Sequence, residues 1–228
     1  MDKTFDSRDW ETLSFLDLQT EYGSVLTCMW EDQIQKHPET AEDEIIKRGY
    51  AIESKLQIGG VLFLGMNPSF PQGEKNQTGR YFYDWDENND YFKAFSAFSE
   101  LTFGKVYPCH HDIFFIRHTD QKTLLNKRND NSYKDFFDKQ LNISKSIIRR
   151  TDPRLIVILN ARVRDIFHEI YPFDELRDFD DSLGAYRLEI EGKNVPVIFS
   201  GMLSGQRALD RGSKMNLRWQ IKHVLQMY

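Results

Sequence analysis

The sequence predicts an α/β protein with three layers, α/β/α, around a central and mostly parallel four-stranded sheet. Two observations predict this class: four short apolar runs occur along the chain, and segments with helical spacing of apolar residues lie between them. Alternation of strands and helices is typical of a parallel sheet with helices on both faces. A third observation, the absence of repeats and linkers, predicts a single domain over residues 1–228, with a helical segment at residues 1–55 packed on it.

The apolar runs are short and nearly unbroken, as in strands that are buried on both faces. They are Val61–Leu64, Ile113–Ile116, Leu155–Leu159 and Val195–Phe199. A further strand, Tyr186–Ile190, alternates in polarity and joins Val195 through Glu191-Gly-Lys-Asn194, which predicts a hairpin. Ligands of such sheets bind beyond the carboxyl ends of the strands, so we expect the site among residues 65–70, 117–120, 160–164 and 200–211.

Helical segments are indicated by apolar residues three or four positions apart. One face of the first segment comprises Tyr22, Val25, Leu26 and Met29. The later faces comprise Tyr91, Phe95 and Phe98; Phe137, Leu141, Ser144 and Ile148; Val163, Ile166, Phe167 and Ile170; and Leu217, Ile221, Val224 and Leu225. Pro153 and Pro172 follow two of these segments and predict where they end, because proline interrupts a helix.

Composition and charge restrict the classes of function. The 228 residues are 40% hydrophobic and 29% charged, which predicts a folded globular protein. A net charge of −5 argues against binding nucleic acid by charge alone, although an acidic protein can carry a local basic face. Cys28 and Cys109 lack the spacing of a thiolate metal site or a disulfide framework, which predicts thiols in a reducing compartment. The charged amino terminus and the lack of an apolar run of ~18 residues predict a soluble, cytoplasmic protein without a membrane partner.

The stretch Val61-Leu-Phe-Leu-Gly-Met-Asn-Pro-Ser-Phe70 is the most informative motif. Gly65 allows close approach of another backbone, and Asn67-Pro68 forces a fixed turn where the predicted strand ends. An amide held there can orient a water through its carbonyl oxygen, or pair with the edge of a base through both of its polar groups. The alternative is a tight turn between strand and loop without a functional role.

This stretch resembles the first active-site motif of the uracil-DNA glycosylase superfamily, G-[I/M/Q]-[N/D]-P, in the Asn form of its mismatch-specific and single-strand-selective branches. Further on, Thr78-Gly-Arg-Tyr-Phe82 resembles the T-G-x-P-F stretch of the mismatch-specific branch, with Tyr81 at the family proline. The resemblance implies the uracil-DNA-glycosylase fold, Asn67 as the catalytic residue, and Phe82 as the ring that stacks on a flipped base. We also expect Met66 and Phe70 to contact the base. For Phe82 the alternative is a place in the core.

The second predicted strand ends where the family carries a polar residue, often Asn, that recognises the base. This chain has Arg117 and His118 there, and we expect them to bind a base edge or a phosphate; the alternative is a solvated strand end. His110 and His111 lie before that strand without the carboxylate or cysteine spacing of a metal site. They are therefore predicted to be surface residues.

The last predicted strand leads into the segment where the family has its second motif, H-P-S or N-P-S-G. Ser204-Gly205 aligns with the S-G of that motif, which places Met202 at the family His or Asn. The family side chain stabilises charge on the departing base, and methionine cannot donate a hydrogen bond. The predicted phosphate- or DNA-binding residues are Ser204, Gly205, Gln206, Arg207 and Arg211. The alternative for the basic residues is a solvated helix face.

Taken with the resemblance, these features predict a DNA-repair protein that hydrolyses the N-glycosidic bond of a flipped uracil or another damaged or mismatched base. Its partner would be DNA, a nucleotide or a nucleobase, and it would act as a monomer without a metal or organic cofactor. Two alternatives are a non-catalytic relative that binds nucleic acid or a nucleobase, and a different small-molecule hydrolase or binder on the same fold. We expect one pocket to be lined by Asn67, Phe82, His118 and Ser204.

Overall fold

Six strands form one central sheet in the computed structural model, which describes residues 14–70, 79–84, 90–103, 109–171, 176–205 and 208–227. Their order across the sheet is β6 (Cys109–Asp112), β4 (Val61–Gly65), β7 (Leu155–Ile158), β10 (Lys193–Phe199), β9 (Ala185–Ile190) and β8 (Leu176–Asp180). The first four run parallel, and β9 and β8 continue the sheet in antiparallel orientation. The predicted parallel core and the predicted β9–β10 hairpin are confirmed. The predicted size of four strands is wrong, because two antiparallel strands extend the core.

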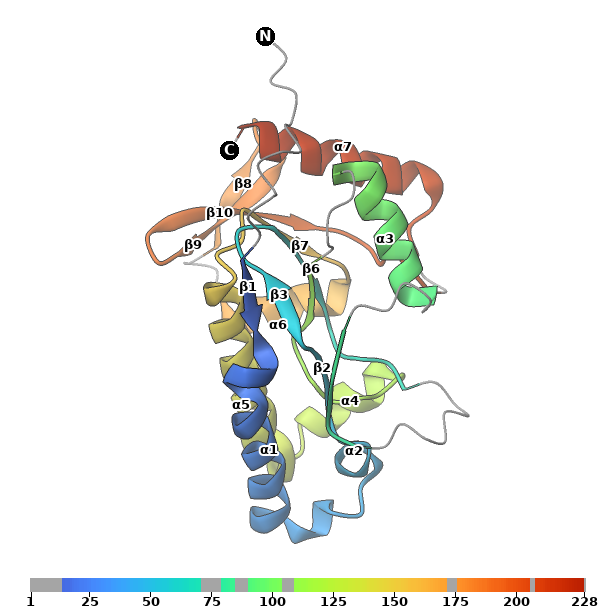
Figure 1. The fold of residues 1–228 in the computed structure, drawn as a ribbon, viewed down its shortest axis with the longest axis vertical. Coiled ribbons are helices and arrows are strands. Elements are labelled where there is room, and N and C mark those ends of the chain that lie inside the picture. The colour runs from blue at the N-terminus through green and yellow to red at the C-terminus, as the bar shows by residue number, and fades with distance from the viewer. Residues whose placement is uncertain are drawn as a thin grey trace.

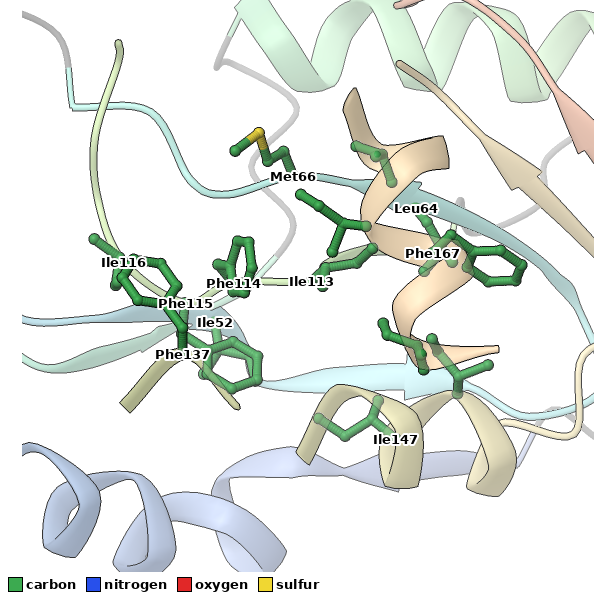
Figure 2. Close-up of a cluster of buried hydrophobic side chains, with 14 of the residues drawn as sticks. Ile52, Leu64, Met66, Ile113, Phe114, Phe115, Ile116, Phe137, Ile147 and Phe167 are labelled. Carbon is green, nitrogen blue, oxygen red and sulfur yellow. The ribbon is translucent and has the colours of Figure 1, made fainter. Parts of the chain in front are cut away.

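The second strand lies earlier in the chain than the apolar run predicts. It is β6, Cys109–Asp112, which pairs with β4 and forms the edge of the sheet, whereas Ile113–Ile116 continues out of the sheet. The backbone of that run is still bonded, since Phe114 N donates to Met66 O at 2.8 Å and Ala51 N donates to Phe115 O at 3.1 Å. Its side chains fill the core beside Phe137 (Figure 2). The run is apolar because it is buried.

Helices cover both faces of the sheet (Figure 1). One face carries α3 (Asp90–Phe103) and α7 (Arg211–Met227), which pack on the side of β4 that presents Phe63. The opposite face, which presents Leu64, carries α1 (Leu18–Lys36), α5 (Asn131–Arg150) and α6 (Ala161–Ile170). Because successive strand residues point to opposite faces, alternate positions of β4 and β7 join two separate hydrophobic clusters. This arrangement is a three-layer α/β/α structure.

The helices begin where the sequence offers a capping side chain. Asp17, Asp130 and Asn160 each accept a hydrogen bond from a backbone N–H in the first turn of α1, α5 and α6, respectively. The predicted apolar faces of α6 and α7 are buried throughout. In α1 the prediction is wrong for Val25, which is 46% exposed, because the buried face is shifted toward Leu18 and Trp30. No helix in the described ranges is long and apolar enough to span a membrane.

The amino-terminal segment is less helical than predicted. Besides α1 it contains a short 3-10 helix (Pro38–Thr40) and α2 (Glu44–Lys47), as well as two strands, β1 (Phe15–Asp17) and β2 (Ala51–Glu53). Strand β1 pairs with β3 (Lys55–Gln57), and β2 pairs in parallel with β5 (Tyr81–Tyr83). Both β2 and β3 contact β6, so these small sheets cover the edge of the central sheet. They also bring β5 to the carboxyl end of β4 and β6.

Candidate functional site

A cavity of about 510 Å³ lies beyond the carboxyl ends of the parallel strands. Its volume is in the range of small-molecule sites, roughly 300–1,000 Å³. The segments that line it include residues 65–69 after β4, 117–119 after β6, 159–160 after β7 and 202–205 after β10. The expectation that ligands bind beyond the carboxyl ends of the strands therefore predicted the position of the cavity from the sequence. Helix α4 (Gln121–Arg128) adds Gln121 to the wall of the cavity.

Asn67 is held at this cavity by its amide nitrogen. The nitrogen donates to three backbone carbonyl oxygens, of Pro68 at 3.0 Å, Ile116 at 3.2 Å and His118 at 2.6 Å. The amide oxygen is buried and has no hydrogen-bond partner among the described residues. The amide thus has a fixed orientation, and its oxygen is the atom left to accept a hydrogen bond from a water or a ligand.

The loop that carries Asn67 is joined to the loop after β6 by further hydrogen bonds. His118 N donates to Pro68 O at 3.0 Å, and the Thr119 hydroxyl donates to Phe70 O at 2.6 Å. Phe70 N in turn donates to the Thr119 hydroxyl at 3.1 Å. Because these bonds tie the two loops together, residues 67–70 and 117–119 form one wall of the cavity. The predicted site residues His118 and Asn67 are therefore neighbours.

Arg117 lines the same wall although it is only 1% exposed. Its guanidinium lies between two rings, 4.7 Å from the centroid of Phe70 and 4.8 Å from that of Tyr81. Arg48 covers Phe70 as well, at 4.6 Å. Such cation–π stacking holds the guanidinium plane in place. The prediction that Phe70 contacts a base is corrected accordingly, because its ring is outside the cavity lining and supports Arg117.

Phe82 does not line the cavity, which contradicts its predicted place. Strand residues alternate in direction, and in β5 it is Tyr81 and Tyr83 that line the cavity. Phe82 instead packs on the core, in a T-shaped contact with Tyr50 at 5.9 Å between ring centroids and close to Gly23 of α1. The predicted position of Phe82 at the cavity is therefore wrong by one residue along the strand. Thr78, which begins the same motif, lies outside the described residues.

Asp112 is a cavity residue that the sequence interpretation missed. It is the last residue of β6, pairs with Gly65 and is 8% exposed. Burial, followed by the charge of Glu53, raises its pKa well above the usual value of an aspartate. Its Oδ1 lies 3.8 Å from Nε2 of His110, which also lines the cavity. Had the sequence interpretation put the strand at residues 109–112, it would have identified Asp112 as a candidate site residue, because Asp112 is the polar residue at the end of that strand.

His110 and His111 are buried, at 4% and 0% exposure, so their prediction as surface residues is wrong. Burial lowers the pKa of His110 to about 4, which keeps its imidazole neutral at neutral pH. The side chain of His111 contacts the Glu53 carboxylate through Nδ1 and lies 3.4 Å from the Ser144 hydroxyl through Nε2. The two histidines therefore point in different directions, His110 to the cavity and His111 into the protein.

The Ser144–His111–Glu53 series has the order of groups found in a hydrolase triad. The Ser144 hydroxyl, however, donates to Ile113 O at 2.6 Å, and both Ser144 and His111 have 0% exposure. A nucleophile in that position has no access to a substrate, so the series is structural. The series is nevertheless connected to the cavity, because the hydroxyl of Tyr83, which lines the cavity, donates to the Glu53 carboxylate at 3.3 Å.

The loop after β10 supplies the opposite wall, with Met202, Ser204 and Gly205 in the lining. Leu209 N closes this loop by donating to Met202 O at 2.8 Å, and Gly205 has a φ of 82°, which favours glycine. The Ser204 hydroxyl is buried and has no hydrogen-bond partner in the described part of the chain. The loop therefore brings a hydroxyl group and a thioether to the cavity, as its alignment predicts.

The predicted basic rim is not part of the lining. Arg211 is the first residue of α7, is exposed and lies outside the cavity. None of the other basic residues described on α7 lines it either. Gln206 and Arg207 lie outside the described residues. Met66 does border the cavity, but it is 2% exposed and packs into the core (Figure 2).

Asn160 completes the wall after β7. Its oxygen accepts a hydrogen bond from Arg162 N at 2.8 Å as the cap of α6, and its nitrogen donates to the Gln121 side chain at 3.2 Å. Both polar groups of Asn160 are thus engaged, and its role at the cavity is structural. Over the described ranges, no group of three or more His, Cys, Asp or Glu side chains is arranged to hold a metal ion.

Comparisons with known proteins do not identify a family. No protein-family model matches the chain, and no curated protein matches it at a significant level. What the cavity can do chemically therefore has to follow from its own side chains and from the motif after β4.

Proposed function

We propose that this chain is a uracil-DNA-glycosylase-like protein that hydrolyses the N-glycosidic bond of a flipped uracil or another damaged or mismatched base. The observation that carries the proposal is the fixed amide of Asn67 at a cavity beyond the parallel strands. Its nitrogen is engaged by three carbonyl oxygens, and its oxygen is buried and has no partner among the described residues; in this proposal that oxygen accepts a hydrogen bond from the attacking water. The motif Gly65-Met-Asn-Pro68, which resembles the first motif of that superfamily, supports the same role.

In this proposal the flipped nucleotide enters the cavity with its base between the loops after β4 and β10. Tyr81 and Tyr83 offer aromatic faces to the base in place of Phe82, and Arg117 donates to a base carbonyl or a phosphate. Water held by the Asn67 oxygen then adds to C1′ of the sugar as the bond to the base breaks. Because an amide is a weak base, we expect slow turnover.

A second candidate function is binding of a nucleic acid or a nucleobase without cleavage. Met202 favours it, since its side chain lines the cavity at the position where the superfamily has a hydrogen-bonding residue, and a thioether stabilises a negative charge poorly. The buried Arg117 and the Ser204 hydroxyl serve recognition equally well in a protein that only binds.

Replacing Asn67 by alanine tests the catalytic proposal. We expect cleavage under single-turnover conditions to fall about 100-fold or more, because the water loses the acceptor that orients it. The assay measures alkali-labile sites in single- and double-stranded oligonucleotides that contain uracil, hypoxanthine or a thymine mismatch. Asn142→Ala is the matched control, since Asn142 is exposed on α5, away from the cavity.

The same assay separates the two candidate functions. No cleavage by the parent protein, with DNA binding that weakens steeply as salt rises, contradicts catalysis and supports the binding function. Neither cleavage nor binding would contradict both. Thermal unfolding of Asn67→Ala is measured alongside, because loss of the three hydrogen bonds to backbone carbonyls also removes a link between two loops.

A further inference from the structure

The cavity contains a carboxyl group whose position is set by the backbone beside it. Asp112 ends β6 directly opposite Gly65 of β4, and a Cβ atom on Gly65 would lie only 2.1 Å from Asp112 Oδ1. The carboxyl group therefore occupies the space that a side chain at position 65 would take. Asn67 lies two residues after Gly65, in the loop that follows β4, so Asn67 and Asp112 line the cavity from the carboxyl ends of adjacent strands.

We propose that Asp112 is a further catalytic residue, which donates a proton to the base as the glycosidic bond breaks. This inference rests on the proposed glycosylase function and concerns the same cavity. Asn67, in the loop after β4, holds the water, and Asp112, at the end of the neighbouring strand β6, serves the leaving group. A donor is needed because Met202, on the facing loop, cannot provide one.

The surroundings of Asp112 favour the protonated form of its carboxyl group. Burial raises its pKa well above the usual value, and the negative charge of Glu53 on β2 adds to the effect. Burial also lowers the pKa of His110 to about 4, so that this neighbour on β6 is neutral near pH 7. The other charged or titratable side chains among the described residues that line the cavity are Tyr81, Tyr83, Asp84, Arg117 and His118. A carboxylic acid kept neutral in this way can donate a hydrogen bond or a proton at neutral pH.

In the proposed step, the C1′–N bond breaks, and its electron pair goes to the nitrogen of the base. A proton moves from the Asp112 carboxyl group to the base, which leaves as a neutral molecule. The oxygen of the water held by Asn67 bonds to C1′, and the proton released from that water returns to the Asp112 carboxylate through solvent. The products are the free base and a sugar with a hydroxyl group at C1′.

Asp112→Asn tests this role because it keeps the shape of the side chain and removes the transferable proton. We expect cleavage of uracil to fall about 100-fold or more, in the range typical of general acid catalysis. The parent rate should decline at alkaline pH as Asp112 ionises, whereas the residual rate of the variant should lack that decline. With 5-fluorouracil, whose anion leaves without protonation more readily, the deficit of the variant should shrink. Asp135→Asn, at an exposed position on α5, is the matched control.

A second readout does not depend on cleavage. A raised pKa means that folded protein binds the Asp112 proton more tightly than unfolded protein, so this group destabilises the fold as pH rises above about 4. Asp112→Asn should therefore become more stable than the parent as pH rises. The ratio of the folding equilibrium constant of the variant to that of the parent should increase tenfold for each pH unit, until Asp112 ionises in the folded parent. The pKa can be measured directly from the carboxyl carbon resonance.

The outcomes distinguish the two proposals. If the parent cleaves no substrate, the glycosylase function fails and the role of Asp112 fails with it. If the parent cleaves and Asn67→Ala is impaired, while Asp112→Asn keeps the parent rate and its pH profile, only the role of Asp112 is overturned. A carboxyl resonance that shows Asp112 ionised at pH 7 overturns that role as well, whatever the rates.

Discussion

Gly65→Ala is expected to lower the free energy of unfolding by about 3 kcal/mol and to lower the proposed cleavage about 100-fold or more. The added Cβ would lie 2.1 Å from Asp112 Oδ1 and 2.8 Å from His110 Nε2. Both neighbours are buried on the paired strand β6, so the added methyl group would force their side chains or the paired backbone to shift. The cost therefore comes from overpacking, and the proposed cleavage falls because Asp112 is displaced from its position in the cavity.

Denaturant unfolding measures the stability, and the oligonucleotide assay measures cleavage. Gly23→Ala is the matched control, because Gly23 is within α1 and its added Cβ would meet Phe82 at an ordinary distance of 3.6 Å. That variant should gain roughly 0.5–1 kcal/mol, since alanine is the better helix former. A parent-like stability of Gly65→Ala would mean that the Asp112 carboxyl group does not occupy the space beside β4.

Glu53→Ala is the second substitution with a large expected effect, a loss of about 3 kcal/mol or more in the free energy of unfolding. The Glu53 carboxylate binds His111, which has 0% exposure, and accepts a hydrogen bond from Tyr83. Alanine leaves the buried His111 and the half-buried Tyr83 hydroxyl without this acceptor and creates a small void. Glu53→Gln keeps the shape and an acceptor oxygen and should lose less.

The control for a charge at the surface is Asp138→Ala, which removes an exposed i,i+4 pair with Lys134 on α5. Its effect should stay within about 0.5 kcal/mol, as is usual for exposed pairs. An equally small effect of Glu53→Ala, measured by the same denaturant titration, would contradict a structural role for the buried series.

Glu53 also connects this buried series with the cavity. Its negative charge contributes to the raised pKa of Asp112, so Glu53→Gln should lower that pKa toward the usual value. The alkaline decline of cleavage should then begin at a lower pH than in the parent. A pH–rate profile of Glu53→Gln measures this shift, and an unchanged profile would show that Asp112 does not control the alkaline limb.

The sequence by itself determined the class of fold and the place of the site. Unbroken apolar runs predicted three of the four parallel strands, and the spacing of apolar residues predicted the buried faces of α6 and α7. Gly65-Met-Asn-Pro68 predicted a turn that holds an amide at the end of β4, and Asn67 does line the cavity. These features are local, because strand burial, helix faces and tight turns depend on residues that are close together in the chain.

Only the tertiary structure decided which side chains complete the cavity. An apolar run reports burial but not the hydrogen-bonded neighbour, so Ile113–Ile116 resembled a strand while the pairing strand was the more polar Cys109–Asp112. That shift brought Asp112 to the cavity and buried His110 and His111. In β5 a difference of one position exchanged Phe82 for its neighbours, because strand side chains alternate between two faces. The pairing register of a strand and the face on which each side chain lies are set by contacts between segments that are distant in the chain. No single stretch of sequence contains these contacts.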